Sequence, residues 1–252
     1  MVELFVEEGA RVVIADVHDQ AGATLAEQLG DGVAFAHTDV ADADQIQAAV
    51  DLAVDRFGRL DIMCNNAGVG GSLRGFLDDD FRDFEHMMAV NLKGVMVGSQ
   101  RAALHMAEHG GGVIINTTSI GGINAGSGVT AYRASKAGVI HFTRCIAVEL
   151  AAHNIRVNCI APAHIATAIN AAFDQTKIVQ MMQPLQRMGS PRDVAEAALF
   201  LASERAAQIT GIVMPVDGGT TAGAPTRARG DMRVAALSVD DAAPADTTST
   251  TE

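Results

Sequence analysis

Tryptophan is missing from the 252 residues, tyrosine occurs once and cysteine three times. The three cysteines stand far apart with no Cys-x-x-Cys pair, which argues against a disulfide framework and a zinc knuckle and favours a reducing compartment. The opening MVELFVEEGA lacks the basic region of a signal peptide, and no apolar run approaches the ~20 residues of a transmembrane helix. These absences favour a cytoplasmic protein.

Positive charge is also scarce. The 18 basic residues are outnumbered by 30 acidic ones, so the net charge is −12. No strongly basic face is therefore expected for the phosphates of nucleic acid or for an anionic membrane. A small molecule is the favoured partner.

What the chain does contain is a regular alternation of apolar runs and helical patterns. Strands are predicted at 11–17, 33–40, 60–68, 112–119, 155–163 and 211–219, and helices at 21–30, 43–58, 80–110, 130–154 and 190–203. Most strands are apolar throughout, which is typical of a parallel sheet covered on both faces. The pattern predicts an α/β fold with a doubly wound parallel sheet, and Asp42 is expected to cap the second helix.

The composition changes near Ala222. With 48% hydrophobic residues, the chain can bury a full core, and its length favours one domain, residues 1–221. Residues 222–252 lack aromatics and are rich in Ala, Thr, Asp and Pro. Such a segment cannot bury enough apolar surface to offset its ordering entropy, so a disordered tail is predicted.

The single tyrosine, Tyr132, lies in AYRASK, four residues before Lys136. In a helix these two residues share a face, and a nearby ammonium favours the phenolate by about 1.4 kcal/mol for each unit of lowered pKa. Ser119 ends a predicted strand, at the edge where parallel sheets bind ligands. The three groups are candidate acid/base machinery. The alternative is a structural tyrosine followed by a surface lysine.

These motifs, in this order, resemble the short-chain dehydrogenase/reductase family, a nicotinamide-dependent family with a Rossmann-type three-layer sandwich. Tyr132 and Lys136 match its YxxxK motif, and Ser119 matches its catalytic serine. NNAG at 65–68 and VNLKG at 90–94, which carries Asn91, match two further motifs. The resemblance runs from residue 1 to about 221.

The resemblance implies hydride transfer between nicotinamide and a secondary alcohol or ketone. Tyr132 would exchange a proton with the substrate oxygen, and Ser119 would hydrogen-bond that oxygen. Lys136 would lower the pKa of Tyr132 and hold the nicotinamide ribose. Asn91 would support a water that relays protons. Prearranged donors of this kind stabilise a developing alkoxide.

The cofactor implied is NAD, because Asp16 ends a strand where a Rossmann fold places the acid that binds the adenosine ribose and repels a 2′-phosphate. Asp16 and Asp39 could each instead be turn residues. APAHIAT resembles the family's PGxxxT, with Ala163 in place of the glycine. The expected cofactor-binding residues are Asp16, Asp39, Val40, Asn66, Ala67, Gly68, Tyr132, Lys136, Pro162, Ile165 and Thr167.

The family's glycine-rich TGxxxGxG turn is absent. The chain resembles the family from within its first helix, so the first strand and phosphate loop are expected upstream of Met1. Without that strand, the strands at 11–17 and 60–68 would lack a partner between them. A catalytically silent scaffold that lost its nucleotide turn is the alternative to an enzyme.

Two motifs suggest metal sites but have simpler explanations. His105 and His109 form HxxEH, yet the run ends directly in a glycine stretch and offers no third ligand, so interaction with a helix dipole is favoured. The acidic run 78–80 suits helix capping. No metal is expected.

Substrate and assembly are predicted from apolar content. Residues 165–188 correspond to the family's substrate loop, and their Ala, Ile and Met content suggests an apolar pocket. The helices that carry Asn91 and Tyr132 are apolar around much of their circumference, which predicts a homo-oligomer, expected from the family to be a tetramer.

Overall fold

The computed structural model describes residues 1–166 and 175–225. Thr167 and most of the predicted tail lie outside these ranges. The strands are β1 (Val12–Asp16), β2 (Val33–His37), β3 (Ile62–Asn65), β4 (Gly112–Thr117), β5 (Ile155–Pro162) and β6 (Val213–Val216). The helices are α1 (Val2–Glu7), α2 (Asp19–Leu29), α3 (Ala43–Phe57), α4 (Phe84–Met88), α5 (Val95–Glu108), α6 (Thr130–Leu150), α7 (Gln175–Met182) and α8 (Pro191–Ala202).

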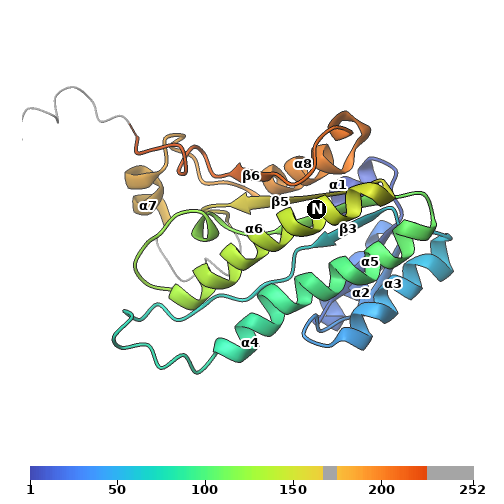
Figure 1. Cartoon of the computed structure of the whole chain (residues 1–252), viewed down its shortest axis with the longest axis horizontal. Helices are drawn as coiled ribbons and strands as arrows, with labels where there is room; N and C mark the ends of the chain where they lie inside the picture. Colours follow the sequence, from blue (N-terminus) through green and yellow to red (C-terminus); the bar gives the residue numbers. More distant parts are fainter. Residues whose placement is uncertain (167–174, 226–252) are drawn as a thin grey trace, which may run out of the picture.

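All strand pairings are parallel, and helices cover both faces of the sheet (Figure 1). On one face, Phe5 of α1 and Leu201 of α8 pack against Ile160 of β5. On the other face, Met106 of α5 and Ala147 of α6 pack around Ile114, Ile155 and Val157. β5 is buried on both faces. A strand in this position requires a mostly apolar sequence, which is the pattern from which the strand was predicted. The predicted doubly wound α/β fold is confirmed.

The sheet consists of two separate ladders. β1 pairs with β2, whereas β3, β4, β5 and β6 form a second, four-stranded ladder. Within the described residues, no ladder joins β1 to β3, although Val12 and Ile62 pack against the same core cluster around Phe5 and Ile115.

The long helix expected at 80–110 begins later and is not uniform. α4 starts at Phe84, a π-helical turn (Ala89–Gly94) follows, and α5 continues to Glu108. A π-turn adds one residue to the helical repeat and is frequent at functional sites. Asn91 lies in this turn and is fully buried. The prediction of one continuous helix over 80–110 was therefore wrong at this position.

The two capping predictions have different outcomes. Asp42 caps α3, as predicted, by accepting hydrogen bonds from the amides of Asp44 and Gln45. The acidic run 78–80 does not cap α4, because it lies in the preceding loop. There Asp80 pairs with Arg74 and Arg82. The Asp80 carboxylate is thus occupied by two arginines instead of helix amides. The sequence reasoning did not consider this pairing.

Candidate active site

Four predicted residues converge at the carboxyl end of the four-stranded ladder. Ser119 follows β4, Tyr132 and Lys136 lie in the first turns of α6, and Asn91 lies in the π-turn beside them. A Cβ atom added to Gly121 would lie 3.5 Å from both Ser119 Oγ and the Tyr132 ring, so the two side chains are close, and the Ser119 hydroxyl lowers the pKa of Tyr132. The Lys136 ammonium lies 5.8 Å from the centroid of the Tyr132 ring. The structure thus brings together the phenol, the hydroxyl and the ammonium that the sequence pattern selected.

The pKa of Tyr132 departs from the expected direction. Burial of the phenol raises its pKa above the ordinary value of 10.0, and the Ser119 hydroxyl and the charge of Arg133 oppose this only in part. The prediction that Lys136 lowers this pKa is therefore not supported. Helical spacing correctly placed the ammonium near the ring, but it does not report how far the phenol is withdrawn from water.

Lys136 itself is a buried cation. Only 3% of the residue is exposed, and its Nζ donates a hydrogen bond of 3.1 Å to the carbonyl oxygen of Thr117. Burial disfavours the charged form and lowers the pKa of this lysine to about 8. Near neutral pH the ammonium and the neutral amine are therefore both accessible, which suits a group that handles protons.

Asn91 ties the turn after β3 to α6. Its Oδ1 accepts from the Val69 amide at 2.8 Å, and its Nδ2 donates to the Val69 carbonyl at 2.9 Å and to Ser135 Oγ at 3.3 Å. Ser135 Oγ in turn donates to the Tyr132 carbonyl at 2.7 Å. Sequence reasoning missed the role of Ser135. The sequence signal that could have revealed it was a small polar residue directly before Lys136. In the structure Ser135 is wholly buried.

The NNAG segment fits tightly beside these groups. A Cβ atom added to Gly68 would lie 3.2 Å from Lys136 Nζ and 3.3 Å from Asn91 Oδ1. Asn66, two residues before Gly68, accepts a hydrogen bond of 3.1 Å from Thr117 Oγ1. Ala67 lies between Asn66 and Gly68 in the chain. Glycine at 68 therefore allows close approach of the backbone to the lysine and asparagine, which a larger residue would displace slightly.

The residues predicted to hold the adenosine end lie on the other ladder. Asp16 ends β1, and its Oδ1 accepts from the His18 amide at 2.9 Å and contacts His18 Nδ1 at 2.7 Å. Partial burial raises the Asp16 pKa, but these hydrogen bonds outweigh it and the net shift is downward. About half of the Asp16 side chain remains exposed (51%). Its carboxylate both forms a local turn and faces solvent.

Asp39 and Val40 follow β2. Asp39 Oδ1 accepts from the Ala41 amide at 2.9 Å, which is the turn role that the sequence left open. A Cβ atom on Gly94 would lie 2.8 Å from the Val40 carbonyl oxygen, so Val40 packs closely on the π-turn. In the described part of the chain, no hydrogen bond or ion pair joins Asp16 or Asp39 to the Tyr132 group.

The segment after β5 is described only as far as Ala166. Pro162 ends β5 opposite Val216 of β6, and Ile165 is buried and forms an isolated bridge with Gly189. Ala163 does not have positive φ. The alanine therefore stands where the family has glycine without backbone strain. Thr167 lies outside the described residues.

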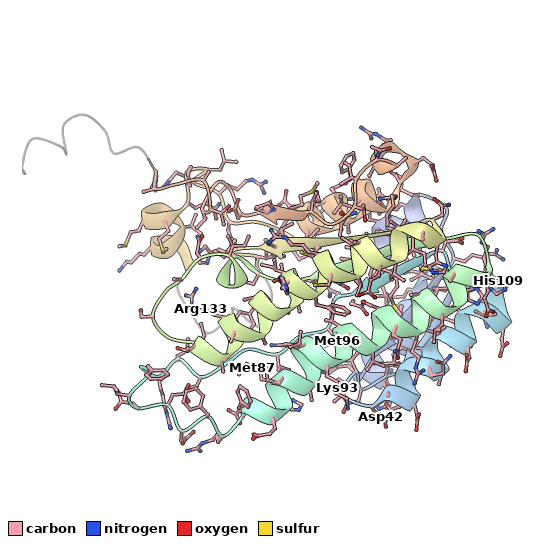
Figure 2. All side chains as sticks on the ribbon, viewed as in Figure 1. Asp42, Met87, Lys93, Met96, His109 and Arg133 are labelled. Carbon is pink, nitrogen blue, oxygen red and sulfur yellow. The ribbon has the colours of Figure 1, made fainter. Side chains whose placement is uncertain are left out.

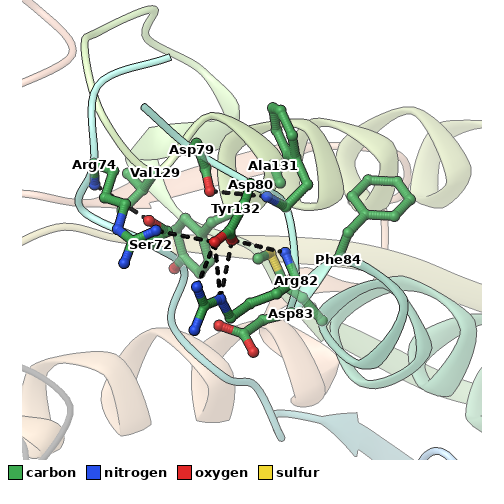
Figure 3. Close-up of a pocket in the computed structure, with 12 residues that line it drawn as sticks. Ser72, Arg74, Asp79, Asp80, Arg82, Asp83, Phe84, Val129, Ala131 and Tyr132 are labelled. Atoms are coloured by element: carbon green, nitrogen blue, oxygen red, sulfur yellow. Dashed lines mark hydrogen bonds and ion pairs between the residues drawn. The ribbon is translucent and has the colours of Figure 1, made fainter. Parts of the chain in front are cut away.

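A cavity of about 230 Å³ lies beside Tyr132 (Figure 3). One wall is Val129, Ala131 and Tyr132, and the other comes from the loop and helix that follow NNAG. The full lining is Ser72, Arg74, Asp79, Asp80, Phe81, Arg82, Asp83, Phe84, Met87, Val129, Ala131 and Tyr132. Sequence reasoning assigned the substrate pocket to 165–188 and missed this second segment. The sequence signal that could have identified this second segment was the cluster of phenylalanines at 76, 81 and 84 among charged residues.

The histidine pair lies far from this cavity. Figure 2 labels His109 at the opposite end of the helical layer from Arg133. The His105 and His109 rings stack at 4.0 Å, His105 Nε2 accepts from the Leu60 amide, and His109 Nδ1 lies 2.7 Å from the His105 carbonyl. Across residues 1–166 and 175–225, no three His, Cys, Asp or Glu side chains form a group suited to a metal ion. In the same ranges, no helix has the length and apolarity needed to cross a bilayer.

Comparison with known proteins gives consistent matches over most of the chain. The model of the Enoyl-(Acyl carrier protein) reductase family matches residues 1–221. Momilactone A synthase of Oryza sativa subsp. japonica is 42% identical over 86% of this chain and 82% of its own length. (+)-Borneol dehydrogenase 1 of Salvia officinalis is 39% identical over 86% of both chains. 3beta-Hydroxysteroid dehydrogenase 2 of Eggerthella lenta is 38% identical over 88% of this chain and 89% of its own.

Solved structures agree with the sequence matches. The 3-ketoacyl-(acyl-carrier-protein) reductase of Brucella melitensis, complexed with NADH, superposes with a TM-score of 0.82 at 32% identity, covering 86% of this chain and 90% of that one. A 7α-hydroxysteroid dehydrogenase complexed with NADH and 7-oxo glycochenodeoxycholic acid gives 0.78 at 34% identity, covering 84% of each chain. The chain is therefore an oxidoreductase that belongs to the short-chain dehydrogenase/reductase family.

Proposed function

We propose that this protein is an NAD-dependent oxidoreductase that interconverts a secondary alcohol and its ketone, with Tyr132 as the general acid/base. The observation that carries the proposal is the placement of Ser119 beside Tyr132, which lines a cavity, with the buried Lys136 ammonium 5.8 Å from the centroid of the ring. A carbonyl oxygen placed between the hydroxyl and the phenol would meet two donors.

The chain's own residues would handle the proton. Tyr132 donates a proton to the substrate oxygen in reduction and takes it back in oxidation, while Ser119 holds that oxygen in place. With its pKa raised, the phenol is protonated near neutral pH, which is the form that donates in reduction, but it holds that proton more tightly than a solvated phenol does. Lys136 supplies positive charge beside the developing phenolate. Asn91 fixes the surrounding backbone, and its predicted role in a water relay remains a prediction. The nicotinamide supplies or accepts the hydride.

The residues present fit a nicotinamide nucleotide at two points. At the catalytic end, Gly68 brings the backbone close to the buried Lys136 ammonium, where an added Cβ would lie 3.2 Å from Nζ. At the other ladder, the half-exposed Asp16 carboxylate can accept ribose hydroxyls and would repel a 2′-phosphate. The solved relatives bound to NADH support the same choice of NAD. Pro162, Ile165 and Thr167 are proposed to border the carboxamide.

The proposed substrate is a mostly apolar alicyclic alcohol or ketone. Phe81, Phe84 and Met87 line the cavity beside Tyr132. Met181 and Leu185, in the described part of the predicted substrate loop, are 75% and 66% exposed. Large apolar side chains left in water favour an apolar ligand. The relatives named for borneol and hydroxysteroid support this class.

We propose further that the protein is a cytoplasmic homotetramer. The three cysteines are free, as a reducing compartment favours. Met96 and Leu104 of α5 and Val148 of α6 are 43%, 59% and 80% exposed. These side chains lie on the two helices predicted to pair subunits, and covering them would remove apolar surface from water.

Two measurements test the function. Titration with the native protein should enhance NADH fluorescence, and (+)-borneol or cyclohexanol with NAD⁺ should yield absorbance of reduced nicotinamide. Tyr132→Phe should lower turnover by ~10²- to 10⁴-fold, because it removes the proton carrier, while NADH binding is retained. A flat NADH titration, or unchanged turnover in the Phe variant, would instead support the catalytically silent scaffold.

A further inference from the structure

Arg133, the residue after Tyr132, turns its side chain back onto the loop before α6. Its Nε donates to the Gly128 carbonyl at 3.3 Å, and its Nη1 donates to the Asn124 carbonyl at 3.0 Å. A Cβ atom on Gly126 would lie 2.6 Å from Arg133 Nη2, so the loop closes tightly over the guanidinium. Figure 2 shows Arg133 near the amino-terminal end of α6.

The loop that Arg133 holds leads directly into the cavity wall. Val129 has φ of 47°, a left-handed conformation that is rare for a β-branched residue and persists only where surrounding contacts enforce it. Its amide donates to the Ser72 carbonyl at 3.1 Å, and its carbonyl accepts from the Arg133 amide at 2.9 Å. Val129 and Ser72 both line the cavity beside Tyr132. The guanidinium thus holds the loop at Asn124 and at Gly128, the residue directly before Val129.

We propose that Arg133 is a positioning residue for the substrate: it holds loop 124–129 against Ser72 and so fixes the wall that faces Tyr132. This inference rests on the proposed function of the cavity. Lysine cannot replace the arginine fully, because one ammonium lacks the planar fork that reaches two carbonyls at fixed separation. Arg133 does not itself need to touch the substrate.

The charge of Arg133 has a second effect on the same site. The described residues offer it carbonyl partners and no carboxylate, so its charge is not neutralised locally. That charge lowers the pKa of Tyr132 against the upward effect of burial. The other charged groups near Tyr132 are Lys136 on the same helix and the cavity residues Arg74, Asp79, Asp80, Arg82 and Asp83. Asp80 is paired with both Arg74 and Arg82.

The test uses three variants of the full chain: Arg133→Met, Arg133→Lys and the control Arg144→Met. Arg144 is exposed on the same helix, so its variant removes an equal charge at a distance from Tyr132. Because the chain has one tyrosine and no tryptophan, the ultraviolet absorbance of the phenolate reports Tyr132 alone. This titration needs neither nucleotide nor substrate, and circular dichroism at each pH confirms that the fold persists.

Arg133→Met should move the phenol transition to higher pH, and amide exchange at 124–129 should become faster. Arg133→Lys should keep the wild-type transition, while KM for the probe (+)-borneol rises about tenfold with a smaller change in kcat. Arg144→Met should match wild type in all measurements. Unchanged titration and unchanged exchange in Arg133→Met would overturn the inference, and so would a wild-type KM in Arg133→Lys.

Failure of the proposed function gives a different result. In that case wild type binds no NADH and turns over no alcohol, whereas the phenol titration and the exchange of loop 124–129 still respond to Arg133. Should Arg133→Met not fold, the KM of Arg133→Lys decides the inference.

Discussion

The two ladders of the sheet differ in how they hold their candidate functional residues. At the end of the four-stranded ladder, Asn91 and Lys136 are 0% and 3% exposed, and Asn91 is tied to α6 through Ser135. At the end of the two-stranded ladder, Asp16 is about half exposed and its hydrogen bonds reach only to His18. The proposed proton chemistry needs groups fixed relative to one another, whereas the proposed contact with a ribose hydroxyl would tolerate a solvated edge.

The difference follows from strand pairing. β4 and β5 each have hydrogen-bonded neighbours on both sides, whereas β1 is paired on one side only in the described residues. A strand with one neighbour has fewer packed side chains and more exposed backbone groups. In β1, Ile14 is the one buried residue, whereas most residues of β5 are buried. Substitutions on the two ladders should therefore differ in size.

The largest effect is expected from core truncation. Ile160→Ala, in β5, removes a fully buried side chain from the cluster that joins α1 and α8 to the sheet, and should destabilise by ~3–5 kcal/mol. Ile14→Ala, in β1, should cost less, about 2 kcal/mol, because the residue is 9% exposed and its site can relax. Urea unfolding of both variants measures the difference. Equal losses would show that the two ladders are equally well packed.

Next comes Lys136→Met, which separates stability from activity. The pKa of Lys136 in the folded protein, about 8, lies below its ordinary value of 10.5. Between these two pH values the folded protein therefore binds fewer protons than the unfolded chain. Wild-type stability should accordingly rise from pH 8 towards pH 10. Below this window the buried ammonium costs roughly 3 kcal/mol, less what its bond to Thr117 returns. The Met variant should be more stable near neutral pH, with a flatter pH profile, and about 100-fold less active.

Denaturation across this pH range, with turnover measured beside it, checks both parts. A Met variant whose stability still rises with pH as in wild type would assign the rise to another group. One that is less stable near neutral pH would show that the ammonium is better compensated than its single carbonyl partner suggests.

Local signals in the sequence predicted most of the fold and the core of the site. Asp42 was recognised as a cap because capping depends on neighbouring amides, and Tyr132 and Lys136 were placed on one face because helical spacing is fixed. The raised pKa of Tyr132 was missed because depth of burial depends on the whole molecule. The loop held by Arg133 and the tie between Asn91 and Ser135 were missed because they join segments whose proximity periodicity does not encode.

A smaller effect is expected from the tight approach of NNAG to α6. Gly68→Ala would place a methyl group 3.2 Å from Lys136 Nζ and 3.3 Å from Asn91 Oδ1, so these side chains must shift by a few tenths of an ångström. We expect about tenfold lower kcat/KM. Gly70→Ala is the matched control, because its added Cβ would meet nothing within 4 Å. Equal activity in the two variants would show that the lysine side of the site tolerates displacement.

The smallest effect is expected at the solvated edge of β1. Asp16→Asn removes one half-exposed charge, and repulsion between two unit charges in water is worth about 1 kcal/mol at close range. The ratio of NADPH to NADH affinity, measured by fluorescence titration, should therefore rise about fivefold. Asp19→Asn is the control, since this acid begins α2 and pairs with His37. If both variants change the ratio equally, general charge rather than the position of Asp16 selects the cofactor, and the two-stranded ladder has no specific role in recognising it.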